Sequence, residues 1–196
     1  MAVLEGQSPN GNWARIVEEL ARTVADLFRH GASAVALRTT GDESFVVPLA
    51  IEPFIYEGLP FVLFGQPDAG KSYIAAVIAS LAALGERIPG TPFAATQRLV
   101  PLICDWDASE RNLRSRIRRI EKGLRKCLDE KVYYRFCDAP LASSAEQIME
   151  IVEENSIGLL VVDSLGPAAG GDLNAPQPAE AFFAALRQIG VTSVIL

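Results

Sequence analysis

The chain has 196 residues, of which 49% are hydrophobic and 21% charged, and a formal net charge of −6. This composition fits one globular domain with a sizeable core and a small appendage, and it excludes a protein coated in positive charge for nucleic acid, although not a local basic patch. The sequence holds no apolar run of membrane-spanning length, and its start lacks the basic and apolar segments of a secretion signal.

The first predicted elements form an N-terminal appendage. Residues 13–30 place apolar side chains at helical spacing, which predicts an amphipathic helix that ends at Gly31. Two short apolar runs, 34–38 and 44–47, flank a Gly-Asp turn and predict a β-hairpin. We therefore divide the chain into an appendage over residues 1–54 and a main domain over residues 55–196.

The most informative segment follows the apolar run 59–64, which predicts a buried parallel strand. Residues 65–72 read G-x-x-x-x-G-K-S, the phosphate-binding loop called the P-loop or Walker A motif. Residues 73–84 are apolar almost all round, as expected of a helix packed against a sheet. Strand, loop and helix thus come in the order that phosphate binding requires.

The chemistry of the loop explains its spacing. Glycines at both ends let the backbone N–H groups turn toward a phosphate, at the positive end of the following helix. Lys71 supplies a point charge to the β- and γ-phosphates, and the Ser72 hydroxyl is placed to bind Mg²⁺. Asp68 is expected to point away from the phosphates. The candidate nucleotide-binding residues are Gly65, Gln66, Pro67, Asp68, Ala69, Gly70, Lys71, Ser72 and Tyr73.

Further along, strands and helices alternate, which predicts a mostly parallel α/β sheet flanked by helices. The predicted strands cover 99–104, 132–137, 158–163 and 191–196, and the predicted helices cover 109–128, 144–154 and 179–189. Segments 85–97 and 165–178 are predicted loops. Cys104, Cys127 and Cys137 form no C-x-x-C pair, so we expect reduced, buried thiols in a cytoplasmic protein.

A nucleotide site also needs carboxylates. The apolar run 159–162 ends in Asp163, which is the expected second ligand of the metal. Ser164 follows it instead of Glu, so the group that orients the attacking water must come from elsewhere. Asp107, just after the strand 99–104, is our first candidate, with Asp105 and Glu110 as alternatives. Asp107 could instead only cap the next helix.

These residues carry a resemblance to a known family. Residues 55–196 resemble the RecA-like ATPases, and within them the RepA-like group found beside plasmid and phage replication genes and often described as AAA-type domains. The matching segments are 65–72, 102–107, 133–137, 161–166 and 182–194. The resemblance implies a RecA-like P-loop NTPase core in which the catalytic carboxylate is Asp107, where the family pattern has Glu.

The resemblance also implies where the last strand lies in the sheet. It implies that residues 191–196 lie between the strand before the P-loop and the strand that ends at Asp163. In the family this strand continues into further elements, so the resemblance implies that the chain is a fragment of a longer protein or the product of a truncated gene, with an unfinished sheet edge.

One predicted helix is strongly basic. Eight Lys and Arg residues fall between positions 111 and 126. They could form a surface for a DNA backbone or for another subunit, or simply the solvated face of an amphipathic helix. The loop 165–178 contains no Lys or Arg, and we assign no DNA contact to it.

The sequence therefore predicts an Mg²⁺-dependent ATPase, with Lys71 and Asp107 as catalytic residues and Ser72 and Asp163 as metal ligands. The resemblance adds DNA replication or helicase-type work and a homo-oligomer. Two alternatives remain open at this point: a nucleotide-dependent regulatory module with little hydrolysis, and a small-molecule kinase built on the same loop. No partner in a membrane is expected.

Overall fold

The computed structural model describes residues 15, 17–18, 47–128, 131–171 and 175–196. The chain divides into two units, residues 1–45 and residues 46–196, and the fold below is that of the second unit. The predicted N-terminal helix and hairpin lie outside the described residues, apart from a few single positions.

The centre of the fold is a five-stranded parallel sheet. Its strands are β3 (Pro60–Val62), β5 (Val100–Asp105), β6 (Tyr133–Phe136), β7 (Ile157–Asp163) and β8 (Thr192–Ile195), in the order β3-β8-β7-β5-β6. The predicted parallel sheet is confirmed. β8 pairs with both β3 and β7, so the predicted position of residues 191–196 is confirmed as well.

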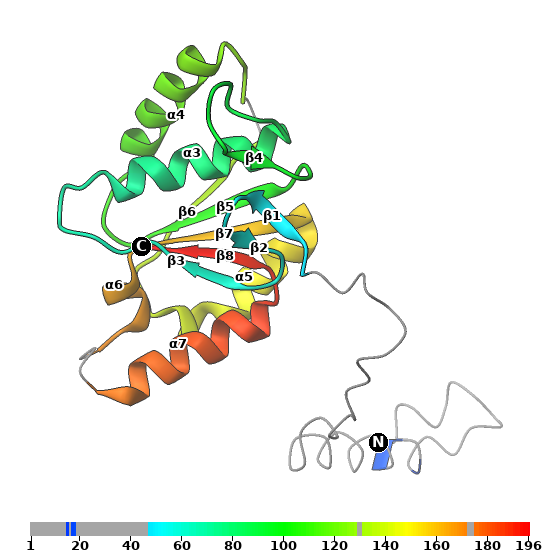
Figure 1. The fold of residues 1–196 in the computed structure, drawn as a ribbon. Coiled ribbons are helices and arrows are strands. Elements are labelled where there is room, and N and C mark those ends of the chain that lie inside the picture. Colours follow the sequence, from blue (N-terminus) through cyan, green and yellow to red (C-terminus); the bar gives the residue numbers. More distant parts are fainter. Residues whose placement is uncertain (1–14, 16, 19–46, 129–130, 172–174) are drawn as a thin grey trace. The chain divides into compact units, whose positions relative to one another are not determined.

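Helices cover both faces of this sheet (Figure 1). Helices α3 (Lys71–Leu84) and α4 (Glu110–Leu124) lie on one side, and α5 (Leu141–Asn155), α6 (Leu165–Ala169) and α7 (Pro176–Ile189) lie on the other. The prediction that the helix over 109–128 continues to residue 128 is wrong, because Arg125 adopts a left-handed backbone with φ of 54° and ends it. The predicted loop over 165–178 contains the short helix α6.

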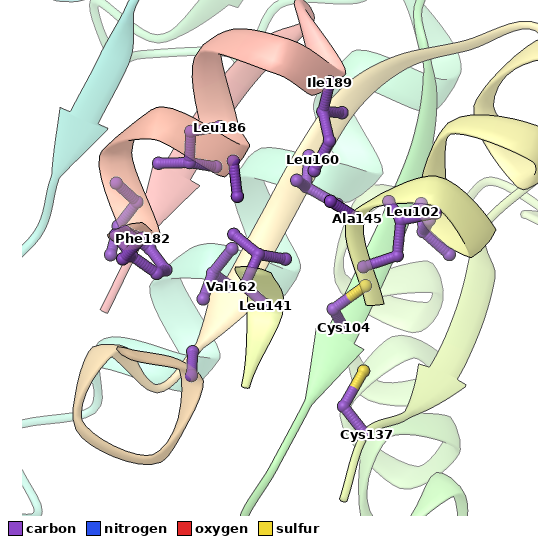
Figure 2. Close-up of a cluster of buried hydrophobic side chains, with 14 of the residues drawn as sticks. Leu102, Cys104, Cys137, Leu141, Ala145, Leu160, Val162, Phe182, Leu186 and Ile189 are labelled. Atoms are coloured by element: carbon purple, nitrogen blue, oxygen red, sulfur yellow. The ribbon is translucent and has the colours of Figure 1, made fainter. Parts of the chain in front are cut away.

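The sheet separates two hydrophobic cores. Side chains of α5 and α7 pack onto β5, β7 and β8 in one core, shown in Figure 2, and α3 and α4 pack onto the opposite face. Cys104 and Cys137 lie in the first core. All three cysteines are free, but Cys127, three residues after the end of α4, is exposed, which corrects the expectation that all are buried.

A second, smaller sheet was not predicted. β1 (Leu49–Glu52) pairs antiparallel with β2 (Ile55–Tyr56) and with β4 (Ala94–Ala95), so the predicted loop 85–97 contributes a strand. Ile51 and Ile55 of this sheet are fully buried with α3 in the second core.

The strand before the P-loop is less buried than its sequence suggests. Within the described residues, β3 pairs only with β8, so one edge of the strand stays uncovered. Val62 is 42% exposed and Phe64, just beyond the strand, is 88% exposed. The prediction of a buried strand over 59–64 is therefore wrong in its burial although correct in its position.

Candidate nucleotide-binding site

The carboxyl ends of the central strands bring together the acidic residues that the sequence singles out. Asp105 ends β5 and Asp163 ends β7, and the two residues are direct partners in the parallel register. β8 separates β7 from β3, the strand that leads into the P-loop. The loop and the carboxylates therefore lie at the same edge of the sheet, where parallel α/β sheets bind ligands.

The loop turns sharply into α3 at Gly70. This residue caps the helix with φ of 81°, a left-handed conformation that costs glycine little, and its carbonyl accepts hydrogen bonds from the N–H groups of Tyr73 and Ile74. The first N–H groups of a helix have no partner inside it, so they remain available to an anion. Asp68 also has a left-handed backbone, with φ of 62°, and lies exposed.

The Lys71 side chain folds back over the loop. Its ammonium Nζ donates hydrogen bonds to the carbonyl oxygens of Gly65 and Gln66 at 2.9 and 3.0 Å. Two carbonyl oxygens are weak partners for a cation compared with phosphate oxygens. The ammonium is thus held close to the loop by contacts that a polyphosphate can replace.

Ser72 and Asp163 meet across the site. The Ser72 side chain lies close enough to the Asp163 carboxylate to affect its ionisation. Burial raises the pKa of Asp163 above its ordinary value of 3.8, while the Ser72 hydroxyl and the nearby charge of Arg116 act in the opposite direction. The carboxylates of Asp105 and Asp107 also raise this pKa. A divalent cation at this position would relieve the repulsion among them.

The three candidates for the water-orienting carboxylate have different surroundings. Asp105 is buried, and its Oδ1 accepts hydrogen bonds from the N–H groups of Asp107 and Ala108, so it shapes the turn after β5. Glu110 is exposed and pairs with Arg114. Asp107 instead points across to β7, where its Oδ2 accepts a hydrogen bond of 2.7 Å from the Ser164 hydroxyl.

This arrangement bears on the capping alternative for Asp107. Helix α4 begins after Ser109, and neither Ser109 nor Asp107 makes a side-chain cap to its N-terminus. The Asp107 side chain is turned toward the end of β7 through Ser164. Asp107 therefore makes no side-chain cap to α4, and its catalytic role stays a prediction.

Sequence reasoning missed two residues that shape the site. Ser164 positions Asp107 through their hydrogen bond, although the sequence marked it only as the missing Glu. Trp106 links the end of β5 to two neighbouring segments. Its backbone N–H donates a hydrogen bond to the Asp163 carbonyl at 2.8 Å, and its indole Nε1 donates one to the Ala139 carbonyl at 2.9 Å. A polar residue after one strand gives no sequence signal of its contact with a residue 57 positions away.

The site suits a metal that is held mainly by its substrate. In the part of the chain that the structure describes, no group of three or more His, Cys, Asp or Glu residues could bind a metal ion alone. Mg²⁺ usually takes one or two protein oxygens and fills its other positions with phosphate oxygens and water. The Ser72 hydroxyl and the Asp163 carboxylate are the oxygens that would bind such an ion.

A P-loop at the start of α3, with carboxylates on the second and third strands from it, defines a nucleotide-binding core with RecA-like strand order. A family model described as an AAA domain matches residues 42–196. The chain belongs to this family, and membership indicates a nucleotide-binding ATPase. A comparison with curated proteins found no significant match. None of the described helices is long and apolar enough to cross a membrane.

Proposed function

We propose that the chain binds ATP with Mg²⁺ and hydrolyses it. The observation that carries the proposal is the convergence of Lys71, the Ser72–Asp163 pair and Asp107 at one sheet edge. An ATP-binding module without hydrolysis would need the loop and the metal ligands, but it would not need a carboxylate held beside them by Ser164.

Each residue has a distinct role in this proposal. The backbone of residues 65–72 and the Lys71 ammonium bind the phosphates, and Tyr73 lies next to them at the start of α3. Ser72 and Asp163 hold Mg²⁺, which when bound neutralises charge on the β- and γ-phosphates. Asp107 accepts a proton from, or orients, the attacking water, and the Ser164 hydroxyl fixes the direction of its carboxylate.

We further propose that hydrolysis is coupled to DNA replication or helicase-type work by a homo-oligomer. The support is the resemblance of residues 55–196 to the RepA-like group, together with the RecA-like strand order. This is an argument from fold and family, and it identifies neither the DNA substrate nor the number of subunits.

Isothermal calorimetry with ATP and Mg²⁺ tests the nucleotide site. The unmodified chain should release or absorb heat on binding, and Lys71→Ala should lower the affinity at least about a hundredfold, because a charge-assisted contact to phosphate is lost. Arg187→Gln is the matched control, since it removes one exposed positive charge from α7, far from the loop in the sequence. Unchanged affinity of Lys71→Ala would contradict the site.

A phosphate-release assay then separates the proposed activity from its rivals. An ATPase releases inorganic phosphate at a rate that depends on Asp107, whereas a regulatory module binds ATP with little turnover. A small-molecule kinase transfers the phosphate to an acceptor and releases little of it. Thermal unfolding of each variant shows whether a loss of activity reflects a loss of fold.

A further inference from the structure

Positive charge is concentrated on α4 and the two residues that follow it. Residues 110–126 contain eight basic and two acidic residues, a net charge of +6 in a chain of net charge −6, so the remaining residues carry −12. We call the exposed side of α4 formed by Arg111, Arg114, Arg118, Arg119 and Lys122 the basic face. None of these five residues belongs to the P-loop or to the group of carboxylates at the candidate nucleotide site.

The basic face encloses a hollow. A concave region of about 460 Å³ is lined by the five basic side chains and Ser115, with no acidic residue among them. Of the five basic residues, only Arg114 forms an ion pair within the described part of the chain, and its partner is Glu110. Four positive charges therefore line the hollow without an acidic partner in the described part of the chain.

A neighbouring hollow has a different character. It lies between α4 and β6, shares Arg114 and Arg118 with the first, and is also lined by Glu110, Glu121 and apolar side chains. Mixed charge and an apolar floor do not favour a polyanion. The first hollow is therefore the better candidate for binding an anion, because all its charged lining residues are basic.

The basic face contains no apolar anchor. The apolar residues of α4, Leu113, Ile117, Ile120 and Leu124, pack into the core beneath the helix. Stable protein–protein interfaces bury aromatic and aliphatic anchors at their centre, and a surface of Arg, Lys and Ser offers none. It also offers no aromatic ring on which the bases of a single strand could stack.

The charge pattern does not serve the stability of the helix. Arg114, Arg118 and Lys122 follow one another at intervals of four residues, and like charges at this spacing destabilise a helix. Arg111 stands in the first turn, where the helix dipole disfavours a cation. A solvated face that served only solubility would mix both signs. A function outside the helix explains the pattern better.

We propose that the basic face of α4 binds the phosphate backbone of double-stranded nucleic acid without reading its sequence. From Arg111 to Lys122 the helix extends about 16 Å, a length over which a duplex presents roughly ten phosphates. Arginine suits this ligand because its planar guanidinium binds phosphate oxygens in pairs. The proposal rests on the coupling to DNA in the proposed function, but not on ATP hydrolysis.

Fluorescence anisotropy with a labelled DNA duplex of arbitrary sequence tests the proposal, in the absence of nucleotide and over a series of salt concentrations. Binding by the unmodified chain should weaken as salt rises, with a logarithmic slope of about −0.9 for each phosphate neutralised. The double variant Arg118→Gln/Arg119→Gln should bind at least about tenfold more weakly, and its slope should be smaller by about two.

The matched control is the double variant Arg98→Gln/Arg187→Gln, which removes the same charge from exposed positions outside the basic face. It should bind the duplex as the unmodified chain does. Equal weakening by both double variants would overturn the proposal, because net charge alone would then explain the binding. If the unmodified chain does not bind the duplex, the proposal is also wrong, even if calorimetry shows that the chain binds ATP.

One further measurement distinguishes nucleic acid from an acidic protein surface as the occupant. Sedimentation of the chain and of Arg118→Gln/Arg119→Gln should give the same oligomeric state. If the double variant loses self-association while the duplex binds neither protein, the basic face contacts another copy of the chain, and the proposal is wrong. ATP affinity and thermal unfolding of the double variant confirm that its fold is intact.

Discussion

Helices α3 and α4 pack side by side on the same face of the sheet, yet their sequences have little in common (Figure 1). α3 has 14 residues, eight of them buried, and no charged residue in its last turn; α4 has 15 residues, of which only Leu113 and Ile120 are buried. α3 contacts strands of both sheets and also α4, so most of its side chains are covered, and those that are buried are nearly all apolar. α4 has only one covered side.

The two helices also offer anions different kinds of contact. α3 presents backbone N–H groups at a fixed turn, which select a phosphate by shape and distance. α4 presents flexible charged side chains, which attract phosphates over a distance that depends on salt. The comparison teaches that two neighbouring helices can offer an anion two kinds of donor: fixed backbone N–H groups at the start of α3, and mobile charged side chains along α4.

The strongest test of the comparison is Asp107→Asn. If the chemistry belongs to the end of α3 and the neighbouring carboxylates, this variant should lose about a hundredfold to ten-thousandfold in turnover while it keeps its affinity for ATP. The amide still accepts the hydrogen bond from Ser164, so the local structure should persist. Phosphate release and calorimetry measure the two quantities. If turnover persists, Asp107 is not the water-orienting residue, and Asp105 or Glu110 must be tested.

The difference in burial predicts a difference in stability. Ile78 of α3 is 3% exposed, and Ile78→Ala should lower the free energy of unfolding by about 2–5 kcal/mol. Ile117 of α4 is only partly buried, and Ile117→Ala should cost about half as much. Urea unfolding measures both. Equal losses would mean that α4 is as deeply integrated into the core as α3.

Asp163→Asn should raise the stability of the nucleotide-free protein. Because burial raises its pKa, the Asp163 carboxyl adds stability below its ordinary pKa of 3.8, and this contribution is lost as pH rises through the folded pKa. At neutral pH the ionised group is therefore unfavourable, and asparagine removes its charge while it keeps nearly the same size. Thermal unfolding should show a midpoint a few degrees higher at neutral pH, with the gap closing in acid.

The same variant should bind ATP with little dependence on Mg²⁺. A lower unfolding midpoint at neutral pH would show that the carboxylate stabilises the fold, contrary to its surroundings. Unchanged Mg²⁺ dependence would show that Asp163 does not hold the metal. The prediction about the unfolding midpoint and the prediction about Mg²⁺ can be contradicted separately, since the first concerns the protein without nucleotide and the second concerns ATP binding.

The smallest expected effect concerns α4 itself. Arg118→Gln/Arg119→Gln removes repulsion between like charges three and four residues apart, so the free energy of unfolding should rise by about 0.5–1 kcal/mol. The rise should shrink at high salt, where exposed charges are screened. Unfolding at two salt concentrations measures this, and a decrease in stability would mean that the two arginines support the helix.

The sequence predicted the parts of the fold that depend on local pattern. The strand, loop and helix around residues 65–72 could be predicted from the eight-residue P-loop motif and its apolar flanks. The parallel sheet could be predicted from the alternation of strand-like and helix-like segments. Asp163 was found because it ends an apolar strand. The family resemblance supplied the position of residues 191–196 in the sheet, which no local pattern encodes.

The parts that the sequence did not predict depend on contacts between distant residues. The sheet of β1, β2 and β4 joins strands of two to four residues from segments some 40 positions apart, too short for a periodic signal. The apolar run 59–64 resembles a central strand, yet only pairing determines that β3 has one uncovered edge. Likewise, the role of Ser164 appears only once β5 and β7 lie together.

The chain contains two tryptophans, and one of them, Trp106, stands between Asp105 and Asp107 with its indole N–H fixed by the Ala139 carbonyl. Emission from an indole changes with the polarity and charge around it. Trp13→Phe would leave Trp106 as the sole emitter, so the protein carries a built-in optical reporter beside the carboxylate assigned to the reaction. Ligand arrival, metal exchange and turnover could then be followed in real time without an attached dye.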